Sequence, residues 1–347
     1  MTVPIYKGRT HFIVIAILLF DLWLASGCNP VPATALITEV PASLTNQQVE
    51  TLASLIKVDA YPLYTLHYVG EYAEVAQAAP RPTAGACSLF AALGNSQSRL
   101  YGRNFDWHYS PATLLFSDPP EGYASVSMVD IAYLFPNAKT ARSLEELPLK
   151  ERIALLDTWQ MPFDGMNEYG LAVGMSAVSD SMTPNDPAKA TMDSLQVMRQ
   201  VLDRARTVDE AVEILGSYNI DWIGGPQVHY LVADEDGGAA LIEYYEREMV
   251  VFQNEQLWLQ ATNFTVAAQN GSPLGVCPRY DRIHARLSQT NGSLTPVEAL
   301  DLLEQVASSD KAFGTQWSVV YDLSARRVQV VMGREYGNVY EFKVGEE

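Results

Sequence analysis

The chain has 347 residues, of which 48% are apolar and 10% aromatic, enough for a substantial folded core. Its 41 Asp and Glu residues outnumber its 23 Lys and Arg residues, so the formal net charge is -18 at pH 7. This charge opposes binding to nucleic acid or to an anionic bilayer, and we expect no nucleic-acid partner.

Residues 1–28 have the pattern of an export signal. Lys7 and Arg9 precede the apolar run Phe12–Phe20, which is too short to span a bilayer comfortably. Small residues then lead to Cys28, a pattern similar to a bacterial lipoprotein cleavage site at which Cys28 is lipidated. An ordinary signal peptide or an uncleaved anchor is the alternative. In each case we expect an exported protein whose only membrane contact is through this N-terminal anchor.

The next segment, 29–44, is rich in Pro, Ala and Thr without periodicity, which is typical of a tether. Folding is expected to begin at about Thr45. The pattern predicts an amphipathic helix over 46–57 and a strand over 61–70, followed by a Pro- and Gly-containing loop over 76–86.

A β-hairpin is predicted to begin at Cys87, with strands at 87–93 and 99–107 and turn residues at 94–97. Further strands are predicted at 124–135, 170–178, 227–233, 239–245, 257–261, 317–323, 327–332 and 339–344. Two helix pairs are predicted, at 194–204 and 208–217 and at 279–288 and 296–307. Many antiparallel strands with two helix pairs favour an α+β fold, a four-layer αββα sandwich with two sheets between helix layers.

The chain contains three cysteines, Cys28, Cys87 and Cys277. With Cys28 assigned to export, a disulfide between Cys87 and Cys277 is one interpretation in an oxidising compartment. The other interpretation makes Cys87 a nucleophile, which needs a neighbouring base to take its proton. Structural or surface roles are expected for the histidines, since none stands in a recognisable catalytic pattern: His11, His67, His108, His229 and His284.

A cysteine at the start of a chain carries its own base, because an α-amino group has a pKa of roughly 7.7 to 8.0. Cleavage between Ala86 and Cys87 would create this arrangement. The small residues Gly85 and Ala86 place little bulk around the bond to be cut.

Downstream, Gly102-Arg103-Asn104-Phe105-Asp106 stands on the returning strand, with Arg103 16 residues and Asp106 19 residues after Cys87. Together with Asn167-Glu168-Tyr169-Gly170-Leu171, Thr262-Asn263 and Pro278-Arg279-Tyr280, this pattern resembles the choloylglycine hydrolase superfamily. These linear amide C-N hydrolases are N-terminal-nucleophile enzymes. They include bile-salt hydrolases, penicillin V acylases, acid ceramidase-like amidases and 6-aminopenicillanic acid acyltransferases.

The resemblance implies that Cys87 is the nucleophile through its sulfur and the base through its α-amine. It implies that Arg103 favours the thiolate and that Asp106 orients the α-amine. Asn263 would donate to the oxyanion, and Arg279 would steady the surroundings of the nucleophile. Because Arg103 and Asp106 are an odd number of residues apart, a bulge or a strand end would be needed to place them on one face. A surface ion pair between them is the alternative.

The segment beginning at Asn167 also matches the family, and Asn167 is a further candidate. Bile-salt hydrolases carry a second oxyanion asparagine shortly after it, whereas Met, Ser, Ala and Val stand at 175–178 here. A backbone N–H would have to serve instead. The long segment before Cys87 looks more like the acid ceramidase-like and acyltransferase branch. We therefore expect 45–86 to be an upstream segment cut from a catalytic domain at 87–347.

The expected function is hydrolysis of the linear carboxamide of a small N-acyl compound through a thioester, with no metal or organic cofactor. Four aromatic residues are candidates for an apolar acyl pocket: Trp107, Phe116, Tyr133 and Trp159. One alternative is an acyltransferase that passes the acyl group to an amine. Another is a surface-tethered binding protein without catalysis, in which Cys87 is bridged or idle.

Overall fold

The computed structural model describes residues 43–73, 86–222 and 225–345. The predicted export signal with Cys28, nearly all of the tether and most of the loop before Cys87 lie outside the described residues. Among the helices that are described, none is both long enough and apolar enough to cross a membrane.

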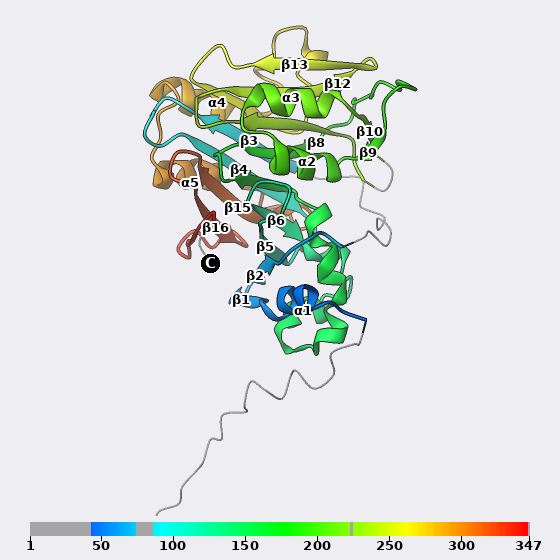
Figure 1. The fold of residues 1–347 in the computed structure, drawn as a ribbon. Helices are drawn as coiled ribbons and strands as arrows, with labels where there is room; N and C mark the ends of the chain where they lie inside the picture. Colours follow the sequence, from blue (N-terminus) through cyan, green and yellow to red (C-terminus); the bar gives the residue numbers. More distant parts are fainter. Residues whose placement is uncertain (1–42, 74–85, 223–224, 346–347) are drawn as a thin grey trace, which may run out of the picture. The chain divides into compact units, whose positions relative to one another are not determined.

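Two large sheets form the centre of the fold (Figure 1). Sheet A contains, in spatial order, β1 (Ile56–Asp59), β2 (Leu63–Tyr68), β5 (Ala112–Ser117), β6 (Ser125–Asp130), β7 (Asp164–Asn167), β8 (Ala172–Ala177), β11 (Val228–Ala233), β12 (Ala239–Tyr245) and β13 (Glu248–Gln253). Sheet B contains β14 (Trp258–Ala261), β3 (Ala86–Ala92), β4 (Leu100–Trp107), β15 (Gly314–Asp322), β16 (Arg327–Met332) and β17 (Tyr340–Lys343). Sheet B is antiparallel, whereas sheet A has one parallel pair, β2 with β5.

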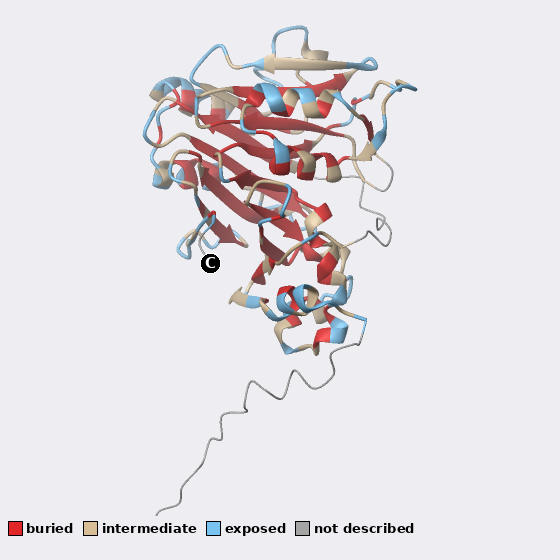
Figure 2. Ribbon diagram, viewed as in Figure 1, coloured by how far each residue is buried: buried red, intermediate tan, exposed pale blue. Residues whose placement is uncertain are grey.

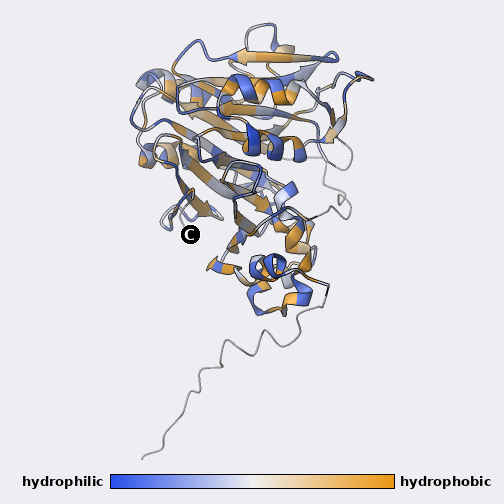
Figure 3. Ribbon diagram, viewed as in Figure 1, coloured by the Kyte–Doolittle hydropathy of each residue, from blue (hydrophilic) through white to orange (hydrophobic). Residues whose placement is uncertain are grey.

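Helix layers cover the outer faces of both sheets. Helices α2 (Gln196–Arg204) and α3 (Val208–Gly216) pack on sheet A, and α4 (Pro278–Thr290) and α5 (Pro296–Gln305) pack on sheet B. The sheets face each other through β3 with β8 and β12 with β14. Buried, apolar residues are concentrated in the strands and on the inward faces of the helices (Figures 2 and 3). The predicted four-layer αββα sandwich is confirmed.

The remaining elements are short. Helix α1 (Asn46–Ala53) precedes β1, and β9 (Thr191–Asp193) pairs in parallel with β10 (Asn219–Asp221). Single turns of 3-10 helix complete the described chain, with one longer segment, η6: η2 (Ile131–Tyr133), η3 (Thr140–Arg142), η4 (Leu144–Glu146), η5 (Leu149–Glu151), η6 (Ile153–Gln160) and η7 (Ala267–Gln269).

Capping residues explain where several elements begin and end. Thr295 opens α5 with a capping box in which Glu298 returns the hydrogen bond, and Thr45 does the same for α1 with Gln48. Helix α1 ends at Ala53 instead of 57, because the chain turns at Ser54 into β1. The prediction of a longer helix is wrong here.

The predicted strand over 124–135 ends at Asp130, since the Asp130 carboxylate accepts from the N–H of Ala132 at 2.9 Å and starts a 3-10 turn. Six strands were missing from the sequence-based prediction: β1, β5, β7, β9, β10 and β13. Strand β5 is almost wholly buried and therefore lacks alternation, and β7 has only four residues with polar ones at both ends.

The segment before Cys87 is part of the fold. Strand β2 pairs with β5 inside sheet A, and Leu63, Tyr64 and Leu66 of β2 are fully buried. Sheet A is therefore built from residues on both sides of the Ala86–Cys87 bond. Sheet B, apart from Ala86 at the start of β3, lies downstream of this bond.

Candidate active site

Strands β3 and β4 form the predicted hairpin, in the middle of sheet B. Cys87 stands opposite Phe105, and Ala86 stands opposite Asp106. The expected bulge lies in the neighbouring strand β15, where the register shifts between Thr315 and Trp317. It does not bring Arg103 and Asp106 to one face. Arg103 contacts sheet A, whereas Asp106 contacts α4 and the start of β15, so ordinary strand alternation is kept.

Arg103 approaches the sulfur from the space between the sheets. Its side chain is fully buried, and Nη2 lies 3.8 Å from Cys87 Sγ. Nη1 bonds Asp164 Oδ2 on β7 at 2.5 Å and also the Phe163 carbonyl. Tyr321 and Trp317 donate to the same carboxylate. The alternative of a surface ion pair with Asp106 is thus excluded, because Arg103 belongs to a buried pair across the two sheets.

The groups around the Cys87 thiol shift its pKa in opposite directions. Burial raises the pKa of Cys87, while the positive charge of Arg103 lowers it and the charge of Asp106 raises it. Burial is the largest of these effects, so the pKa of the Cys87 thiol stays above its usual value, and Arg103 is the charge in this site that favours the thiolate.

Asp106 is buried on the other side of the hairpin. Its Oδ1 accepts from Thr315 Oγ1 at 2.5 Å, and its Oδ2 lies 3.4 Å from Arg279 Nη1. Burial raises the pKa of Asp106 to about 6, against the lowering effect of Thr315 and Arg279. Thr315 was not among the predicted site residues, since it comes from a strand far along the chain.

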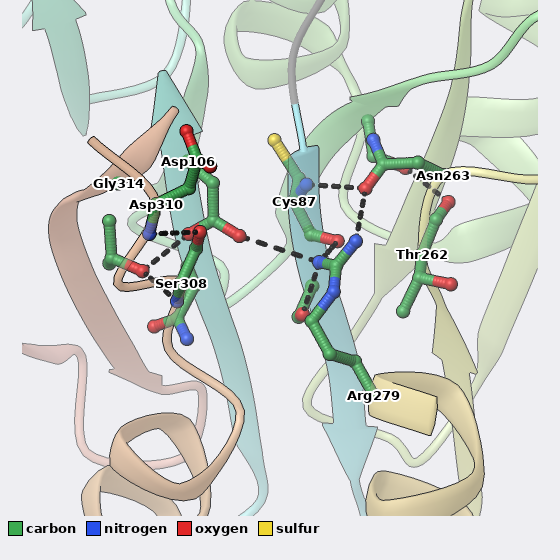
Figure 4. A network of polar contacts seen from close by, with 12 residues as sticks. Cys87, Asp106, Thr262, Asn263, Arg279, Ser308, Asp310 and Gly314 are labelled. Atoms are coloured by element: carbon green, nitrogen blue, oxygen red, sulfur yellow. Dashed lines mark hydrogen bonds and ion pairs between the residues drawn. The ribbon is translucent and has the colours of Figure 1, made fainter. Parts of the chain in front are cut away.

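Arg279 and Asn263 hold the main chain at Cys87 (Figure 4). Arg279, at the start of α4, donates to the Cys87 carbonyl at 2.5 Å and to Ser88 Oγ at 2.9 Å. It also donates to Asn263 Oδ1 at 2.9 Å. The same Asn263 oxygen accepts from the N–H of Cys87 at 2.5 Å. The nitrogen that cleavage would free is thus held by Asn263, and Asp106 reaches Cys87 through Arg279.

The amide nitrogen of Asn263 donates to the Ala177 carbonyl at 2.8 Å. This bond turns the N–H side of the amide toward the end of β8, where Ser176 and Ala177 line the pocket beside Cys87. The stretch 175–178, which has no asparagine, therefore contacts Asn263 through its backbone.

Asn167 is not part of this group. Its Nδ2 donates to the carbonyls of Leu202 and Ala205, and its Oδ1 accepts from the N–H groups of Tyr169 and Leu171. All of these partners are backbone groups of the β7–β8 turn and of the C-terminal end of α2. The structure gives Asn167 a positional role in the fold, away from Cys87.

Both described cysteines, Cys87 and Cys277, are free thiols, so the alternative of a disulfide between them is not realised. Cys277 is half-buried and stands at the N-cap position of α4, two residues before Arg279, with no capping bond from its side chain. Burial raises its pKa, but hydrogen bonds, first that of Thr262, and the charge of Arg279 bring it below the usual value.

An apolar pocket opens beside the sulfur. Trp107 and Tyr133 line it, as the sequence suggested. Phe116 instead stacks on His67, and Trp159 stacks on Tyr72, both outside this pocket. The other residues that line it are Cys87, Arg103, Phe105, Phe163, Met175, Ser176, Ala177, Ser194, Gly225, Pro226 and Val228. Apart from Arg103, which is charged, most of the lining side chains are apolar or aromatic, so the pocket suits an uncharged apolar group.

Comparison with known proteins agrees with this architecture. Residues 87–270, more than half of the chain, match the model of the family described as linear amide C-N hydrolases, choloylglycine hydrolase family. No curated protein matches the sequence.

Two solved structures show the same fold at low identity. A mutant of the conjugated bile acid hydrolase from Clostridium perfringens has 18% identity and a TM-score of 0.55, with 75% of this chain and 93% of that chain covered. Penicillin V acylase from Agrobacterium tumefaciens has 18% identity and a TM-score of 0.51, with 74% and 86% covered. Given the family match and the shared fold, this chain belongs to the choloylglycine hydrolase family and is a linear amide C-N hydrolase.

Proposed function

We propose that Cys87 is the nucleophile of this enzyme and that it becomes N-terminal when the chain cuts itself between Ala86 and Cys87. The proposal rests on one observation: three polar side chains contact different atoms of Cys87. Arg103 faces its sulfur, Asn263 faces its nitrogen and Arg279 holds its carbonyl. No other described cysteine has this set of contacts.

In the self-cutting step, Cys87 Sγ attacks the Ala86 carbonyl carbon and the peptide nitrogen of Cys87 leaves with a proton. Water then hydrolyses the resulting ester of the thiol, which releases the Ala86 carboxylate and the free α-amine of Cys87. The small side chain of Ala86 and the bond from Cys87 N to Asn263 support this step.

In turnover, the thiolate attacks the carbonyl carbon of a linear carboxamide, and the oxyanion accepts a hydrogen bond from the Asn263 amide. The α-amine of Cys87 takes the thiol proton and returns it to the leaving amine. A water molecule, deprotonated by the same amine, cleaves the thioester and releases the carboxylic acid. Thiol and α-amine are regenerated, so the cycle balances.

The lining of the pocket supports a proposal for the substrate class. We infer a small N-acyl compound whose acyl group is apolar and uncharged, because aromatic and aliphatic side chains line the space beside the sulfur. We further propose that the enzyme is exported and held at a membrane through lipidated Cys28. The place of 43–73 within the fold supports the acid ceramidase-like and acyltransferase branch.

Intact-mass measurement and N-terminal sequencing test the cut. We expect a fragment that starts at Cys87, absent in Cys87→Ala and present in the matched control Cys277→Ala. An uncut wild-type chain that ignores thiol reagents would support the non-catalytic binding protein instead. Products from a panel of N-acyl amides, with and without an added amine, separate hydrolysis from acyl transfer.

A further inference from the structure

A second polar cluster lies next to the candidate active site, on three adjacent strands of sheet A. Ser176 of β8, His229 of β11 and Glu243 of β12 are each 1% exposed. Ser176 Oγ lies 2.6 Å from His229 Nε2, and His229 Nδ1 lies 2.9 Å from Glu243 Oε1. Burying three such groups is costly unless their hydrogen bonds are satisfied, so the partners of the cluster indicate its role.

Both ends of the cluster bind the segment that carries Asn263. At one end, Ser176 Oγ lies 2.8 Å from the Thr262 carbonyl. At the other end, Glu243 accepts from the N–H groups of Val266 and Ala267, each at 2.8 Å. Asn263 lies between these attachment points. The segment 262–267 is therefore tied to sheet A on both sides of the candidate oxyanion donor.

The order hydroxyl, imidazole, carboxylate is also that of a serine hydrolase triad, and Ser176 lines the same pocket as Cys87. The direction of the hydrogen bonds argues against a second nucleophile. A carbonyl oxygen only accepts, so the Ser176 proton goes to Thr262. With the Ser176 proton on Thr262, the proton between Ser176 Oγ and His229 Nε2 comes from the imidazole, whereas the imidazole of a triad accepts from the serine.

We propose that Ser176, His229 and Glu243 are positioning residues that fix the segment 262–267 and thereby aim the Asn263 amide at the oxyanion. This inference rests on the proposed function of Cys87 and Asn263. It assigns the three residues no bond-making or proton-transfer step in the reaction. It explains why Glu243 is kept in the core between β12 and the loop after β14, where its partners are His229 and the N–H groups of Val266 and Ala267.

Ser176→Ala tests the proposal, because it removes the link to Thr262 without adding bulk. We expect kcat of amide hydrolysis and the rate of self-cutting to fall about tenfold, with KM changed less than about twofold. Hydrogen–deuterium exchange of the peptide that covers 262–267 should rise. The rate of Cys87 alkylation by iodoacetamide should stay at the wild-type value, since Arg103 keeps its contact with the sulfur.

Ser181→Ala is the matched control. Ser181 is also buried, and its hydroxyl donates to a carbonyl, that of Tyr244, at 3.0 Å. This variant should keep kcat, KM and the exchange of 262–267. Ser176→Thr, which retains the hydroxyl, should recover most of the lost kcat.

Three results would overturn the inference. Wild-type kcat and exchange in Ser176→Ala would show that the link positions nothing. Covalent labelling of Ser176 by a fluorophosphonate would show a second nucleophile. A wild-type chain that neither cuts itself nor hydrolyses any amide would instead refute the proposed function, and this inference with it.

Discussion

The two sheets contribute to the candidate active site in different ways. Sheet B carries the groups that would react, with Cys87, Arg103 and Asp106 on a single hairpin. Sheet A carries groups that hold them, among them Asp164 on β7 and Ser176 on β8. A hairpin fixes the spacing of its residues along the chain, so its motif can be seen in the sequence. The partners in sheet A are selected by packing across the interface between the sheets.

The largest expected effect concerns the composition of sheet A after the proposed cut. Apart from Ala86, sheet B would consist of one chain, whereas sheet A would consist of two, because β1 and β2 precede Cys87. Burial of Leu63, Tyr64 and Leu66 is worth roughly 1.5–3 kcal/mol each. We expect the upstream fragment to elute with the catalytic chain in size exclusion and to separate from it only in denaturant.

Two variants sharpen this expectation. Leu66→Asp places a charge at a fully buried position and should release the fragment after the cut. Ile56→Asp makes the same kind of change on β1 at a position that is 61% exposed, and the fragment should stay bound. Free catalytic chain from the unaltered protein would show that β2 adds little to sheet A.

The next effect concerns the ion pair that joins the sheets. Asp164→Asn would leave the buried Arg103 guanidinium without its carboxylate, and we expect unfolding free energy to fall by about 3 to 5 kcal/mol. The rate of Cys87 alkylation should also change, since the position of Arg103 depends on Asp164. Urea denaturation and iodoacetamide kinetics measure the two effects.

Asp203→Asn is the control for this pair. Asp203 bonds another fully buried arginine, Arg199, at 2.9 Å on α2. The Asp203→Asn variant should have a lower unfolding free energy but an unchanged rate of Cys87 alkylation. An equal change in alkylation in both variants would mean that the thiol responds to general loosening and not to Arg103.

The two sheets also differ in how much of the fold and of the candidate site could be predicted from the sequence. The hairpin at Cys87, the two helix pairs and the layer order follow from periodicity and turn residues, and the structure confirms them. Asp164 was missed because β7 has only four residues, in which a buried acid is not distinguishable from a turn residue. Thr315 was missed because its partner Asp106 is more than two hundred positions away in the sequence. His229 was assigned a structural role from the sequence, without any sign of Ser176 or Glu243 as its neighbours.

A smaller effect is expected from the ionisation of Asp106. Its pKa is raised to about 6, so the ionised form is disfavoured in the folded state. Its contribution to stability is therefore fully present below about pH 4 and is lost as pH rises through about 6. Relative to Asp106→Asn, the wild-type protein should lose about 3 kcal/mol of unfolding free energy between pH 4 and pH 7.

Activity should have the opposite trend. The ionised carboxylate is the form that pairs with Arg279, so hydrolysis should decline as pH falls below about 6. Denaturation curves and initial rates across this range measure both trends. A stability difference between wild type and Asp106→Asn that does not vary with pH would contradict the assignment.

The smallest expected effect comes from Thr315, whose hydroxyl donates to Asp106 and lowers its pKa. Thr315→Val removes this bond and keeps the shape of the side chain, so the pKa of Asp106 should rise further. We expect the acidic limb of the rate profile to move to higher pH by up to about one unit, with the rate at pH 8 close to that of wild type.

Thr113→Val is the matched control for Thr315→Val, since the Thr113 hydroxyl on β5 is buried and has no hydrogen-bond partner within the described residues. Its profile should coincide with that of wild type. If Thr315→Val also coincides with wild type, Asp106 does not set the acidic limb. The α-amine of Cys87 would then be the group that titrates there. Sheet B would in that case control the pH dependence through the main chain of Cys87 and not through the Asp106 carboxylate.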